Sequence, residues 1–153
     1  MSDQDPLGGW LAVVVSDDRG HVLVARRGDT QAWDLPVGLL HRGEDVLAGV
    51  RRVVADSVTV GVSVQWLAGM HSHVRDGLTL VFSARHATGR ATPRGEVQAC
   101  RWVESGVAVR MLWPLRAEQL RGALTNRNPQ PVVIAAAPGP APRLRAAASG
   151  AIG

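Results

Sequence analysis

The sequence contains no lysine and no tyrosine, and it has one cysteine and one phenylalanine. The single cysteine, Cys100, excludes an internal disulfide bridge and fits the reducing conditions of the cytoplasm. It lies in an apolar run, so we expect a buried small side chain there. No apolar run is long enough to cross a bilayer, and the first residues lack the charged start and apolar stretch of a secretory signal. We therefore expect a soluble cytoplasmic protein with no membrane partner.

Because lysine is absent, arginine supplies all of the fixed positive charge, and the formal net charge is +4. The arginines are scattered along the chain and form no stripe, which argues against a nucleic-acid partner. A positive balance suits an anionic small molecule, such as a nucleotide, at least as well. The length of 153 residues fits one small domain.

The strongest local pattern lies between residues 33 and 60. Pro36, Gly38 and Gly43 indicate a loop whose backbone can approach a ligand closely. Asp45 is placed to cap a helix that begins at Val46. Apolar residues then recur at helical spacing, at Val46, Leu47, Val50, Val53, Val54 and Val58. This stretch predicts a loop that leads into one amphipathic helix.

These residues resemble the signature of the Nudix hydrolases. Gly38, Glu44 and Arg52 follow one another with gaps of five and seven residues, as in the Nudix box. Val54 and Val60 fill the two aliphatic positions of that box. The approach Trp-Asp-Leu-Pro-Val-Gly, residues 33–38, is similar to the Leu-Pro-Gly-Gly that commonly precedes it.

The resemblance implies a helix whose carboxylates hold magnesium or manganese against a diphosphate. The positions that carry this chemistry depart from the family pattern. Val53 replaces the glutamate expected after Arg52, Asp56 and Ser57 replace a pair of glutamates, and Thr59 replaces a glycine. We therefore expect a reduced metal site formed by Glu44 and Asp56, with Mg²⁺ or Mn²⁺ bound weakly or not at all.

The resemblance also implies roles for other residues. Glu44 and Arg52 are expected in the catalytic site, together with Glu96, a candidate general base in the loop before the last strand. The residues expected to contact the ligand or cofactor are Gly38, Arg26 and His41.

Several of these roles have a structural alternative. A salt bridge between Glu44 and Arg52 would fasten the loop to the helix. Asp56 would form a surface pair with Arg52, four residues earlier. Arg26 would be a solvated residue at the end of a strand.

The histidines and tryptophans suggest further interpretations. His71 and His73 share one face of a strand, and with His41 they would favour zinc over magnesium if all three converged. Ordinary strand-end histidines are the alternative. Trp33 and Trp66 are candidates for stacking on a flat ligand, although either would also suit a core, and Trp102 is expected in the core.

Turn residues divide the remaining chain into strands and a second helix. We expect a three-layer αβα sandwich of the Nudix type, an α/β fold with a mixed sheet. Residues 1–9 are expected to form a flexible arm, 10–125 the Nudix-like domain and 126–153 a disordered tail rich in Pro, Ala and Gly. The expected strands are 10–15, 21–25, 61–73, 78–87 and 97–103, and the second helix is 112–124.

Two functional hypotheses follow. The first is a hydrolase that acts on a nucleoside diphosphate-linked or other diphosphate small molecule with a reduced metal site. The second is a Nudix-fold protein that has lost this activity and serves as a ligand-binding sensor or partner, or carries out a different reaction in the same cleft. Because family members are often dimers, the resemblance also implies a homodimer.

Overall fold

The computed structural model describes residues 6–73 and 77–125, which form a mixed seven-stranded sheet and three helices. The main path of the sheet has the order β3-β2-β1-β6-β5, with β4 paired to β1 and β7 paired to β2. The strands are β1 (Pro6–Ser16), β2 (Val22–Arg27), β3 (Trp33–Asp34), β4 (Val37–His41), β5 (Gly61–His73), β6 (Gly77–Thr88) and β7 (Val97–Val103); the helices are α1 (Val46–Val58), α2 (Ser105–Met111) and α3 (Pro114–Thr125).

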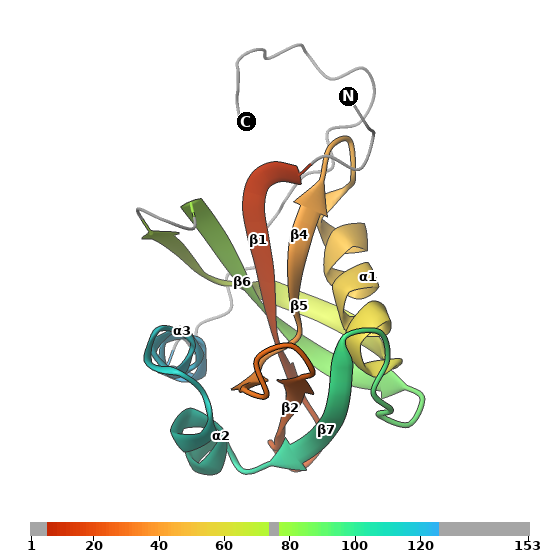
Figure 1. Ribbon diagram of the computed structural model, residues 1–153, viewed down its shortest axis with the longest axis vertical. Coiled ribbons are helices and arrows are strands. Elements are labelled where there is room, and N and C mark those ends of the chain that lie inside the picture. The colour runs from red at the N-terminus through yellow and green to blue at the C-terminus, as the bar shows by residue number, and fades with distance from the viewer. Residues whose placement is uncertain (1–5, 74–76, 126–153) are drawn as a thin grey trace.

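Strand β1 is the centre of the sheet (Figure 1). It runs parallel to β6, from the pair Gly9–Leu78 to the pair Ser16–Arg85. It is antiparallel to β2 and β4. This combination confirms the predicted mixed sheet.

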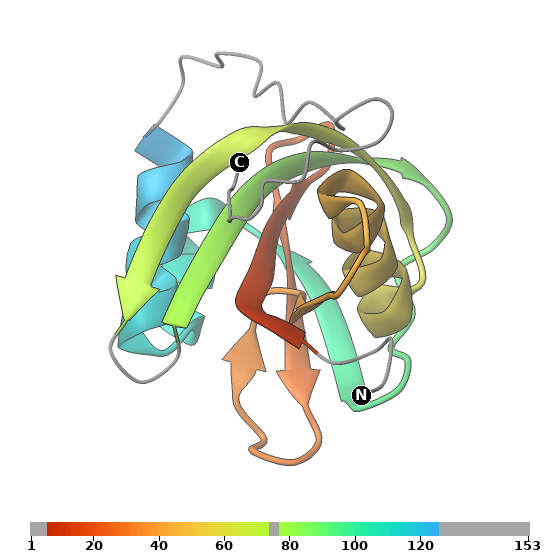
Figure 2. The same cartoon turned by 90° about the horizontal axis from the view of Figure 1, so that it is seen from above.

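The helices cover both faces of the sheet. Figure 2 shows α1 and α3 on opposite sides of β1. Alternation along β1 explains this arrangement, because successive side chains of a strand point to opposite faces. The core on the α1 face contains Leu11, Val13, Val15, Val50, Val53, Val54 and Phe82, and the core on the face of α2 and α3 contains Ala12, Val14, Val22, Val24, Leu35, Leu112 and Leu120. The αβα sandwich is therefore confirmed.

Helix α1 begins as its sequence predicts. The Asp45 carboxylate accepts a 3.0 Å hydrogen bond from the Ala48 amide, which satisfies one of the free N–H groups at the helix start. The helix ends at Val58, and the residue that follows it, Thr59, has a left-handed φ of 57°. That position is where the family pattern has glycine, the residue that adopts this conformation most readily. The predicted apolar stripe is buried against the sheet.

Several of the predicted elements need correction. Strand β1 begins at Pro6, because this segment pairs with β4 at His41, so residues 6–9 are not part of an arm. Residues 37–41 form β4 and not a loop. Helix α2 was not predicted. The predicted arm residues 1–5 and the predicted tail, 126–153, lie outside the described residues.

No helix in the described part of the chain is long and apolar enough to span a membrane.

Candidate functional site

Glu44 and Arg52 form a clamp between the loop before α1 and the helix itself. Arg52 Nε donates to Glu44 Oε2 at 2.6 Å, and Arg52 Nη2 donates to Glu44 Oε1 at 2.9 Å. Arg52 Nη2 also donates to the Leu39 carbonyl at 2.7 Å, which extends the clamp to β4. Glu44 Oε1 accepts a further bond from the His41 amide at 3.1 Å. Both carboxylate oxygens of Glu44 are therefore occupied by protein donors.

This hydrogen bonding also fixes the charge state of the pair. The bond from Arg52 lowers the pKa of Glu44, and the bond to Glu44 raises the pKa of Arg52. Only 17% of the Glu44 side chain and 28% of the Arg52 side chain are exposed, so water screens this pair less than a surface pair. Glu44 and Arg52 therefore form the salt bridge that was given above as the structural alternative to a catalytic role.

Val53 is buried where the family helix carries a carboxylate. Its exposed fraction is 2%, and it belongs to the core between α1 and the sheet. A Cβ on Gly38 would lie 2.9 Å from Val53 Cγ2, so β4 and α1 approach each other closely through this glycine. Gly38 therefore allows β4 and α1 to pack closely against each other.

The remaining positions of the helix supply little for a metal. Ser57 Oγ donates to the Val53 carbonyl at 2.8 Å, within the helix. The Asp56 side chain is 59% exposed and lies 3.9 Å from Arg52 Nη1. Across residues 6–73 and 77–125, no three His, Cys, Asp or Glu side chains gather in a group able to hold a metal ion. Of the three α1 positions that carry glutamate in the family pattern, only Asp56 keeps a carboxylate.

Glu96 lies beside Arg27, whereas Arg26, the other arginine at the end of β2, has a different neighbour. The Glu96 side chain is 76% exposed, and its carboxylate lies 3.3 Å from Arg27 Nη2. Arg27 also pairs with Asp29 at 2.9 Å, and this bond raises the pKa of Arg27. Arg26 instead lies beside the ring of Trp33, with Cζ 5.8 Å from the ring centroid.

Among the described residues, His41, His71 and Cys100 do not gather into one site. His41 lies on β4 and His71 on β5, with β1 and β6 between these strands. His73 ends β5, and its side chain lies outside the described part of the structure. Cys100 packs against the core on the α1 face, and burial raises the pKa of its thiol, as expected for a small core residue.

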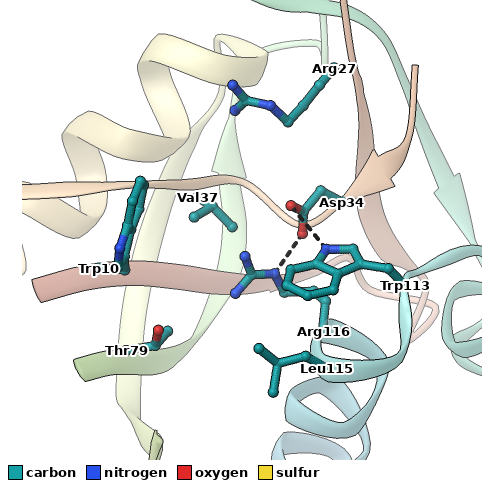
Figure 3. Close-up of a pocket in the computed structure, with 8 residues that line it drawn as sticks. All are labelled: Trp10, Arg27, Asp34, Val37, Thr79, Trp113, Leu115 and Arg116. Carbon is teal, nitrogen blue, oxygen red and sulfur yellow. Dashed lines mark hydrogen bonds and ion pairs between the residues drawn. The ribbon is translucent and has the colours of Figure 1, made fainter. Parts of the chain in front are cut away.

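A pocket of about 260 Å³ opens between the sheet and the start of α3 (Figure 3). We call it the tryptophan pocket, because the indole rings of Trp10 and Trp113 flank it. Its lining is Trp10, Arg27, Asp34, Val37, Thr79, Trp113, Leu115 and Arg116. Flat apolar walls with a few polar groups are typical of a small-molecule site.

A buried polar network forms one side of the tryptophan pocket. Arg116 Nε donates to Asp34 Oδ1 at 2.7 Å, and Arg116 Nη1 donates to Gln119 Oε1 at 2.7 Å. The Trp113 indole nitrogen lies 3.5 Å from Asp34 Oδ2, and the Arg116 guanidinium lies 5.1 Å from the Trp113 ring centroid. In Figure 3 the outer nitrogens of Arg116 point into the pocket.

The sequence analysis did not assign Trp10, Asp34, Trp113 or Arg116 to a site. Asp34 and Arg116 are 82 residues apart, and only the fold brings them together. Asp34 does lie inside the stretch that resembles the family, and this position could have marked it as a candidate site residue.

Comparison with known proteins identifies the family. The profile described as NUDIX domain matches residues 8–122. A MutT-like protein of Streptomyces ambofaciens is 30% identical over 118 residues, which is 76% of each chain. A NUDIX hydrolase of Nitrosomonas europaea has a similar structure, with a TM-score of 0.68, 16% identity and coverage of 82% of this chain and 93% of that chain.

The NUDIX domain of Shewanella oneidensis NrtR, solved in complex with ADP ribose, is also similar in structure. Its TM-score is 0.62 and its identity 17%, with coverage of 76% of this chain and 85% of that chain. Together with the arrangement of α1, β4 and the mixed sheet, these matches show that the chain belongs to the Nudix hydrolase family.

Proposed function

We propose that this protein binds a phosphate-containing small molecule in the tryptophan pocket and lacks efficient metal-dependent hydrolysis of a diphosphate. The observation that carries the proposal is the burial of Val53, 2% exposed, against Gly38. Hydrolysis of a diphosphate requires neutralised phosphate charge and an activated water, which bound metal supplies in such enzymes. Val53 offers no ligand, and Glu44 and Ser57 already bond to protein groups.

The tryptophan pocket suits the flat part of such a ligand. Trp10 and Trp113 offer ring faces for stacking, and Arg116 presents hydrogen-bond donors from a side chain that is 10% exposed. Arg27 lies at the same pocket and carries positive charge for a phosphate. The complex of the NrtR domain with ADP ribose makes ADP ribose a suitable first probe.

Calorimetry tests the proposal directly. Native protein and the variant Val53→Glu/Ser57→Glu are titrated with Mg²⁺ and Mn²⁺, with and without ADP ribose, and the products are analysed by chromatography. We expect the native protein to bind ADP ribose equally well in EDTA and in Mg²⁺, without cleaving it. We expect the double variant to gain metal binding, because it restores two carboxylates to α1.

The control is Arg51→Glu, which adds a carboxylate at an exposed position of α1 outside the apolar stripe. It should gain no metal site. Circular dichroism establishes that each variant is folded, because Val53→Glu places a charge at a buried position. Cleavage of ADP ribose by native protein, at a rate that depends on Mg²⁺, would overturn the proposal.

The exposed carboxylate of Asp56 favours a second candidate, a reduced-site hydrolase. In this alternative Asp56 and Glu44 hold Mg²⁺ or Mn²⁺ weakly, and Glu96 acts as a general base. Magnesium often needs only one or two protein carboxylates when the substrate phosphates complete its shell. Metal binding that appears only with ADP ribose present, and is lost in Asp56→Asn, supports this candidate.

The proposed setting is a cytoplasmic homodimer, with no role for nucleic acid. Light scattering checks the assembly and cell fractionation checks the location.

A further inference from the structure

Two arginines from neighbouring strands approach the same tryptophan ring. Arg26 Cζ lies 5.8 Å from the Trp33 ring centroid, and Arg101 Cζ lies 5.9 Å from it. A guanidinium within about 6 Å of a ring centroid is attracted to the ring. One ring therefore attracts two positive groups.

Strand pairing fixes this arrangement. Arg26 of β2 is directly opposite Trp33 of β3, and Val24 is opposite Arg101 of β7. Residues paired across antiparallel strands project to the same face, and so do residues two apart along one strand. The three side chains therefore share one face across three strands. We call this group the Trp33 cluster.

The charges of the Trp33 cluster are not compensated by acidic groups of the described chain. Arg52, which is half-buried like Arg26, pairs with Glu44, and the buried Arg116 pairs with Asp34. No ion pair joins Arg26 or Arg101 to a carboxylate of residues 6–73 or 77–125. Arg26 is half-buried, so water also solvates it less than it solvates an exposed arginine.

The orientation of Arg26 leaves the outer end of its guanidinium available. Its Nε is buried without a hydrogen-bond partner within the described structure, whereas its two Nη atoms do not share this burial. Stacking on Trp33 thus positions the group, and the Nη atoms remain as donors. Arg101 is exposed and offers its donors in the same place.

We propose that the Trp33 cluster is a binding site for an oxyanion of the phosphate class, outside the tryptophan pocket. Guanidinium groups match phosphate oxygens in charge and in hydrogen-bond geometry, and a bound anion would neutralise positive charge that no described carboxylate compensates. None of the three residues lines the tryptophan pocket, so this site does not depend on the function proposed for that pocket.

Calorimetry with inorganic pyrophosphate, in EDTA and at low ionic strength, tests the site. The variants are Arg26→Gln and Arg101→Gln, each of which removes one charge. Arg101 is exposed, so its replacement leaves the fold intact even if Arg26→Gln does not fold. We expect each variant to weaken pyrophosphate binding roughly tenfold or more, as for loss of a charge-assisted hydrogen bond. The indole N–H resonance of Trp33, assigned with Trp33→Phe, should shift on titration.

Two control variants separate this site from other sources of affinity. Arg90→Gln removes the same charge from an exposed loop and should bind pyrophosphate like the native protein. Arg27→Gln removes the arginine that lines the tryptophan pocket, so any loss of pyrophosphate affinity in this variant belongs to that pocket. The proposal is wrong if Arg101→Gln binds like native protein, if Arg90→Gln weakens binding equally, or if only Arg27→Gln abolishes it.

Discussion

Arg52 donates hydrogen bonds to both carboxylate oxygens of Glu44, at 2.6 and 2.9 Å, across the junction between the loop and α1. The same guanidinium reaches the Leu39 carbonyl of β4 at 2.7 Å. One side chain therefore joins a strand, a loop and a helix. We therefore expect loss of this side chain to lower the free energy of unfolding.

Glu44→Gln should lower the free energy of unfolding by about 1–3 kcal/mol, because Arg52 would keep its charge at a partly buried position without its acid partner. Urea unfolding followed by circular dichroism measures this change. The matched control is Asp56→Asn. The Asp56 side chain is 59% exposed, and a single ion-pair contact of 3.9 Å joins it to Arg52. A loss as large in Asp56→Asn as in Glu44→Gln would contradict the assignment of the clamp to Glu44.

Acid should weaken the same clamp. The hydrogen bond from Arg52 lowers the pKa of Glu44 in the folded protein below its unfolded value of about 4.3. The folded state therefore gains stability above that pH, and the gain is lost as pH falls through the lowered folded pKa. Urea midpoints of native protein and Glu44→Gln should converge between about pH 6 and about pH 3. A gap that stays constant over this range would show that the charge of Glu44 is not its source.

Much of the fold could be predicted because its signals are local. The Asp45 cap and the apolar stripe predict α1, and strands β5 and β7 have the predicted bounds, Gly61–His73 and Val97–Val103. Strand β4 was predicted as a loop because its glycine and its flanking proline indicate a turn. Pairing with β1 makes it a strand, and such pairing leaves no mark in the local sequence.

The site was predictable only in part, for a related reason. Gly38, Glu44 and Arg52 lie within one short stretch, so spacing alone brought them together. Trp113 and Arg116 meet Asp34 from the far end of the domain, and no periodicity links such distant positions. The consequence of Val53 also required the structure, because a buried valine and an exposed valine are identical in sequence.

Close contact between β4 and α1 predicts the effect of a small side chain at Gly38. Gly38→Ala should destabilise the protein by about 1–3 kcal/mol, because the new Cβ would lie 2.9 Å from Val53 Cγ2. Adding Val53→Ala should recover part of this loss by removing the clashing methyl groups. Thermal unfolding of both single variants and the double variant completes a mutant cycle. Strictly additive losses would show that the two side chains do not compete for the same space.

Trp113 provides a test of the tryptophan pocket with little cost to the fold, because 40% of the residue is exposed. Trp113→Ala should weaken binding of ADP ribose by about three- to tenfold, through loss of one stacking face. Isothermal titration calorimetry measures the affinity for ADP ribose. The control is Met70→Ala. Met70 is also an exposed apolar residue, but it lies on β5 away from the pocket lining, so this variant should bind ADP ribose normally. Unchanged affinity in Trp113→Ala would place the ligand elsewhere.

The central position of β1 has a consequence for how the chain is made. Strand β1 spans Pro6–Ser16, yet its longest pairing is with β6, which ends at Thr88. The nascent chain must therefore carry a strand rich in valine and leucine, with no parallel neighbour, until most of the domain has been synthesised. During this interval the apolar residues of β1 lack the cover that β6 provides in the folded domain.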